Sequence, residues 1–155
     1  MIEETKYTEQ EWHRKTAVDL FNLTWRLLEK PDRTDQDNDR MIHAAHASRY
    51  HWGEVGAPAN LARGEWQIAH VYTILNQSQP ALYHARRCLT ICETNGLADF
   101  DMAYAYESVA RALACTGNTP ESAKYRRLAL EAGHGIQDRE DRGQFLNDLQ
   151  ASPWY

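Results

Sequence analysis

The sequence predicts an all-α protein, a right-handed stack of antiparallel helical hairpins with about seven helices. Apolar residues recur at three- and four-residue spacing, and no segment of four or more residues alternates apolar and polar residues convincingly, as a half-buried strand does. A residue pattern also returns 41 positions later, so that Ile68 and Ala69 correspond to Val109 and Ala110. A period of this size is typical of one supersecondary unit stacked on its own copies.

Helix-start and helix-stop signals divide the chain into its expected elements. Thr8 and Glu11 have the spacing of a capping box, and Pro31 ends the first helix. Gly117 is a typical C-terminal stop, and Thr119 is expected to be the N-cap of the sixth helix. The expected helices span about 8–30, 38–52, 59–75, 80–95, 100–115, 119–133 or 135, and 138–151.

The segment 32–39 is acidic and could be taken for a calcium-binding loop. Asp35, Asp37 and Asp39 have the alternate spacing of such a loop, but an EF-hand requires glycine next and a carboxylate at its end. This chain has Arg40 and His46 at those positions. We interpret the segment as a solvated linker whose aspartates favour the positive N-terminus of the second helix.

Composition limits the classes of partner. Hydrophobic residues make up 43% and charged residues 25% of the chain, as in an ordinary globular domain. The formal net charge of −5 argues against nucleic acid, and no apolar run approaches the roughly 18 residues of a membrane helix. The N-terminus lacks the features of a secretory signal, and the cysteine number is odd. We therefore expect a cytoplasmic protein with neither nucleic-acid nor membrane partners.

Small residues recur in both copies where two helix axes would cross closely. They are Ala69, Ala81, Ala85 and Cys88 in the first copy, and Ala110, Ser122 and Ala129 in the second. This pattern resembles the tetratricopeptide repeat, although the period here is 41 residues and the common form has about 34. The resemblance divides a single domain, 1–155, into an irregular N-terminal helix pair (1–58), two repeats (59–96 and 97–135) and a C-terminal capping helix (136–155).

The resemblance implies a concave groove lined by one face of the first helix of each repeat. Aromatic and arginine side chains dominate the energetics of protein interfaces, and this face carries both. The predicted partner-binding residues are Arg63, Trp66, His70, Tyr104, Glu107 and Arg111. The competing interpretation is that Trp66 and Tyr104 pack against the N-terminal helices as part of the core.

Histidines and cysteines raise the alternative of a metal or small-molecule site. His43 and His46 share a helix face, but the chain has no Glu-x-x-His pair, and His43 recurs as His84 at the same repeat phase. Cys88 and Cys92 have no second pair at zinc-finger spacing. We therefore expect no metal and no other cofactor.

The sequence favours a non-catalytic adaptor that binds a protein or peptide in the predicted groove. No nucleophile motif and no phosphate-binding glycine loop is present, so we do not expect an enzyme. The alternative is a self-associating structural module, a homodimer formed through the first helix with Phe21 and Trp25, or through the tail Pro153, Trp154 and Tyr155.

Overall fold

A computed structural model describes residues 4–155 of the chain and confirms the all-α prediction. Within these residues every regular element is a helix. The seven helices are α1 (Glu9–Glu29), α2 (Asp35–Val55), α3 (Pro58–Ile74), α4 (Ser78–Thr94), α5 (Phe100–Thr116), α6 (Thr119–His134) and α7 (Arg139–Gln150).

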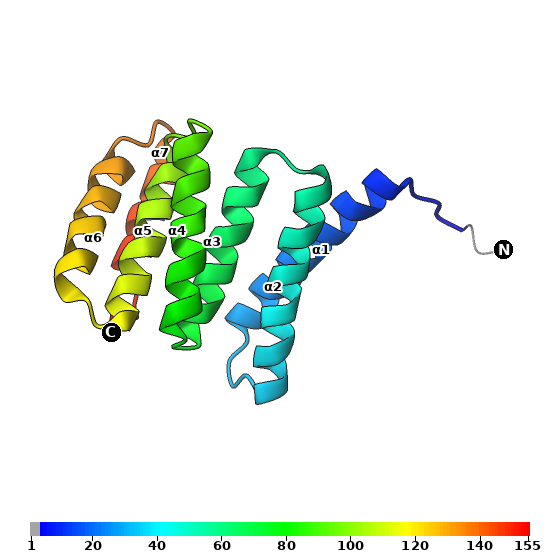
Figure 1. Cartoon of the computed structure of the whole chain (residues 1–155), viewed down its shortest axis with the longest axis horizontal. Coiled ribbons are helices and arrows are strands. Elements are labelled where there is room, and N and C mark those ends of the chain that lie inside the picture. Colours follow the sequence, from blue (N-terminus) through cyan, green and yellow to red (C-terminus); the bar gives the residue numbers. More distant parts are fainter. Residues whose placement is uncertain (1–3) are drawn as a thin grey trace.

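The helices pack as successive antiparallel pairs, α1 with α2, α3 with α4, and α5 with α6 (Figure 1). Each pair is joined to the next through α2 on α3 and α4 on α5, and α7 packs against α5 and α6. Helix α3 also lies beside α5. The helices that begin the last two pairs therefore present neighbouring faces.

The predicted helix signals are confirmed at most termini. Thr8 and Glu11 form a reciprocal capping box, with Glu11 N donating to Thr8 Oγ1 at 3.2 Å and Thr8 N to Glu11 Oε2 at 2.8 Å. Gly117 caps α5 with a φ of +85°, a left-handed conformation that favours glycine. Hydrogen bonds and backbone geometry within a few residues define these two helix ends.

Two predicted features of the second and sixth helices are wrong. The acidic stretch is not a linker, because α2 begins at Asp35 and Thr34 forms a capping box with Asp37. Its aspartates lie in the first turns of the helix, where they still favour the positive N-terminus. The N-cap of α6 is Asn118, whose Oδ1 accepts from Glu121 N at 3.3 Å, and Thr119 is already helical.

Small side chains form the contacts between helices, as their repeat phase predicts. Ala69, Ala85, Ala110 and Ala129 are completely buried, and Cys88 is 2% exposed. Their burial is consistent with close approach of the helix axes, which alanine permits. Within residues 4–155, every helix falls short of the combination of length and apolar character that a bilayer crossing requires.

Two helical glycines give a matched test of the packing between α6 and α7. A Cβ at Gly133 would clash with Cε1 of the buried Phe145, whereas a Cβ at Gly143 would meet nothing within 4 Å. We expect Gly133→Ala to lower the free energy of unfolding by about 1–3 kcal/mol through overpacking. Gly143→Ala should raise it by about 0.5–1 kcal/mol through helix propensity. Urea denaturation measures both changes, and a stabilised Gly133→Ala variant would contradict the close α6–α7 contact.

Candidate binding groove

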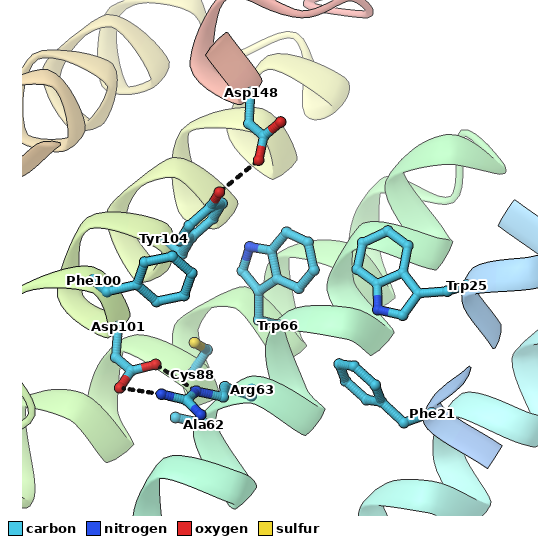
Figure 2. A pocket seen from close by; sticks show the side chains of 10 residues that line it. All are labelled: Phe21, Trp25, Ala62, Arg63, Trp66, Cys88, Phe100, Asp101, Tyr104 and Asp148. Carbon is cyan, nitrogen blue, oxygen red and sulfur yellow. Dashed lines mark hydrogen bonds and ion pairs between the residues drawn. The ribbon is translucent and has the colours of Figure 1, made fainter. Parts of the chain in front are cut away.

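A groove lies between α1 on one side and α3, α5 and α7 on the other, and one end of it is an aromatic pocket of about 280 Å³. Helix α1 packs mainly on α2, whereas α3 packs on α2, α4 and α5, so α1 and α3 meet through a few side chains and not along their whole length. Figure 2 shows the side chains that line the aromatic pocket, which are Phe21, Trp25, Ala62, Arg63, Trp66, Cys88, Phe100, Asp101, Tyr104 and Asp148.

The groove continues along α3 and α5 as a second hollow of about 550 Å³, which we call the polar hollow. The two spaces share Trp25, Trp66, Tyr104 and Asp148 in their walls and therefore adjoin. The other residues that line the polar hollow are Glu29, His70, Thr73, Ile74, Glu107, Arg111, Gln144, Ala151, Ser152 and Pro153.

The structure brings together all six residues that the sequence predicts as the partner-binding set. Because α5 packs beside α3, side chains on the same face of the two helices meet in one groove. Trp66 Nε1 donates to Glu107 Oε2 at 3.2 Å, a hydrogen bond between residues one repeat apart. The groove contains Arg63, Trp66, His70, Tyr104, Glu107 and Arg111.

Aromatic rings form a continuous wall around the aromatic pocket. The ring centroids of Phe21 and Trp25 are 6.3 Å apart, and Trp25 lies 5.7 Å from Trp66. Trp66 meets Tyr104 edge to face at 5.5 Å, and Tyr104 lies 4.6 Å from Phe100. Trp66 therefore contacts α1, as the core interpretation proposed, and at the same time forms part of an open wall.

Charged side chains close the two ends of the aromatic pocket (Figure 2). At one end, Arg63 donates to both carboxylate oxygens of Asp101, at 2.8 and 3.2 Å. At the other, Tyr104 Oη donates to Asp148 Oδ2 at 2.5 Å. Burial, reinforced by this hydrogen bond, raises the pKa of Tyr104, so the phenol keeps its proton at neutral pH.

Arg111 uses its guanidinium group for contacts within the chain and holds the C-terminal tail in place. It is 6% exposed, forms an ion pair with the buried Glu107, and donates to the carbonyl oxygens of Asp148, Ala151 and Pro153 at 2.6, 3.0 and 2.9 Å. Burial raises the pKa of Glu107, while Arg111 and Trp66 oppose that shift. Glu107 and Arg111 therefore position the groove walls and have little surface for a partner.

His70 is neutral at physiological pH. Its ring stacks on Trp66 with centroids 5.1 Å apart and planes 8° from parallel. Burial, with a smaller contribution from the Arg111 guanidinium, lowers the pKa of His70 to about 4. His70 therefore adds a flat, uncharged surface to the polar hollow.

The histidines of the metal alternative lie outside the groove and do not converge on one point. His43 is exposed, whereas Nε2 of His46 hydrogen-bonds Tyr72 Oη at 2.9 Å. His84, the repeat counterpart of His43, bonds instead to Glu65 Oε2 at 2.6 Å. Among the residues that the structure describes, no three histidine, cysteine or acidic side chains gather as metal ligands.

The residues of the self-association alternative lie in two different settings. Phe21 and Trp25 line the aromatic pocket and are not fully exposed. Trp154 packs within the chain, between the guanidinium carbons of Arg111 and Arg126 at 4.3 and 4.1 Å from its ring centroid. Tyr155 Oη donates to the carbonyl oxygen of Thr73. The tail therefore covers part of α3 and α5.

Sequence reasoning missed Phe100, Asp101 and Asp148 as groove residues. Phe100 lies one helical turn before Tyr104, so periodicity alone places the two rings on one face. Asp148 belongs to α7, which the sequence indicates only as a polar capping helix, and no local signal shows that α7 returns to α5.

No protein-family model, no curated protein and no solved structure matches this chain significantly.

The shifted pKa of His70 predicts a pH-dependent contribution to stability. The unfolded chain protonates this side chain near pH 6.5 and the folded protein near pH 4, so protonation favours unfolding as the pH falls through this window. Between pH 7.5 and pH 5 we expect the wild type to lose at most about 2 kcal/mol more than His70→Gln. Urea denaturation at both pH values measures this difference, and identical losses would contradict it.

The Glu107–Arg111 pair predicts a non-additive pair of substitutions. Arg111→Met leaves the Glu107 carboxylate buried without its ion-pair partner and frees three carbonyl oxygens, so we expect a loss of about 3–5 kcal/mol. Glu107→Gln combined with Arg111→Met removes the orphaned charge and should recover part of that loss. Thermal denaturation of the two single variants and the double variant measures the coupling. A double variant less stable than the Arg111→Met protein would contradict the assignment.

Proposed function

We propose that this chain is a cytoplasmic, non-catalytic adaptor with a tetratricopeptide-like architecture that binds a segment of another protein in the groove. The observation that carries the proposal is the pair of adjoining hollows between α1, α3, α5 and α7. Protein ligand sites are concave, mainly apolar, and contain a few placed polar groups. The aromatic wall and the carboxylates of Asp101 and Asp148 have this composition.

The hydrogen bonding in the groove supports a binding role over a catalytic one. Arg63 pairs with Asp101, Arg111 with Glu107, and Tyr104 with Asp148. A general acid or base needs a free, suitably titrating group directed at the reacting atoms, whereas these groups bond to one another. They hold the groove walls in place, so an incoming segment meets a rigid surface.

The groove is short, which limits the affinity that it supplies alone. Two helices, α3 and α5, carry the predicted partner-binding residues. The contacts that they make must first offset the entropy that both molecules lose on association. We therefore expect modest affinity for a single peptide and stronger binding when a second contact is available.

Selection of peptides against the folded chain tests the proposed function. We expect sequences enriched on the wild type to bind Trp25→Ala about tenfold more weakly or worse, because that ring lies in the walls of both hollows. Tyr83→Ala removes an aromatic ring that is 61% exposed and lines neither hollow of the groove, so it is the matched control. Fluorescence polarisation measures both affinities. No enrichment, or equal loss in the two variants, would contradict the proposal.

Exposed apolar side chains on α1 support a second candidate function, self-association. Trp12 is 49% exposed and Val18 is 41% exposed, and both lie on α1 outside the groove. A homodimer contact centred on Trp12 would bury its exposed ring. Light scattering of the purified protein separates the two candidates, since a strict monomer is incompatible with self-association.

A further inference from the structure

The groove carries an excess of negative charge. The residues that line its two hollows include four carboxylates, on Glu29, Asp101, Glu107 and Asp148, and two guanidinium groups, on Arg63 and Arg111. Asp101 and Glu107 form ion pairs with the two arginines, and His70 is neutral. A ligand therefore meets a negative groove in which the positive charges are already occupied.

Asp148 is the carboxylate that faces the aromatic pocket without a positive partner. It accepts hydrogen bonds from Tyr104 Oη at 2.5 Å and from Gln144 Nε2 at 3.0 Å. Arg111 bonds to its backbone carbonyl oxygen, and within residues 4–155 its carboxylate forms no ion pair. Figure 2 shows Asp148 beside Tyr104, at the end of the pocket away from the Arg63–Asp101 pair.

The rings of the pocket offer π surface and few free hydrogen-bonding groups. Trp66 already donates its indole N–H to Glu107, and Tyr104 already donates its hydroxyl to Asp148. The faces of Trp25 and Tyr104, and the face of Trp66 that His70 does not cover, attract a cation through their quadrupoles. A primary ammonium group would lose three strong hydrogen bonds to water here, whereas an alkylated ammonium group has little such hydration to lose.

From this geometry we infer that the aromatic pocket binds an alkylated ammonium group, supplied by a methylated lysine side chain of the partner segment. The cation lies against the rings and is neutralised by Asp148. The inference rests on the proposed function, because the polar hollow adjoins the pocket along α3 and α5 and gives the partner backbone a path. A free small cation would fill the pocket and leave the polar hollow empty.

Matched probes test this inference on the full chain. The first is a short peptide with one trimethyl-lysine, and the second is the same peptide with a tert-butyl group in place of the trimethylammonium group. Calorimetry should show the charged peptide binding about tenfold more tightly than its neutral isostere. Asp148→Asn should remove most of that preference, and Trp25→Leu should weaken the charged peptide about tenfold. Glu93→Gln, an exposed carboxylate on α4, should change neither affinity.

Each contrary result has a distinct meaning. Equal affinity for the charged peptide and its isostere would overturn the cation and leave the groove a peptide site. Choline binding as tightly as the charged peptide would overturn the methyl-lysine source in favour of a free cation. If the charged peptide, its isostere and choline all fail to bind, the inference is overturned. The peptides selected on the wild-type protein then decide separately whether the groove binds protein.

Discussion

The buried ion pair between Glu107 and Arg111 is the interaction on which the groove depends. It lies on α5, and its two members bond to α3, to α7 and to the C-terminal tail. Glu107 accepts from Trp66 of α3, and Arg111 holds the end of α7 and the tail through three carbonyl oxygens. A buried charge without its partner is strongly destabilising, so the pair forces α3, α5 and α7 into one arrangement.

The same constraint explains why a groove remains open beside α3. The polar atoms of the pair find their partners on α3, α5, α7 and the tail, so none needs a partner from α1. Helix α1 is held by α2, and it reaches α3 through Trp25 on Trp66 and through Gln67 Nε2, which donates to the Phe21 carbonyl at 3.0 Å. The rings of Trp25 and Trp66 therefore meet between α1 and α3, and the aromatic pocket remains open beside them.

Much of the fold and six residues of the groove could be predicted from local patterns. The repeat phase places Trp66 and Glu107 at equivalent positions, and the capping box at Thr8 fixes a helix start without tertiary contacts. The contribution of Asp148 could not be predicted, because it depends on α7 folding back onto α5. The hydrogen bonds from Arg111 to the tail could not be predicted either. An arginine on a helix face has the same sequence pattern whether it bonds to its own chain or to a partner.

Photo-crosslinking tests most directly our proposal that the groove, and no other face, receives a partner segment. Benzoylphenylalanine replaces Phe21 in the wall of the aromatic pocket or, in a matched protein, the exposed Tyr83 on α4. A peptide selected on the wild-type protein should crosslink from position 21 and remain free when the label is at position 83. Crosslinking from position 83 alone, or equally from both, would contradict the account.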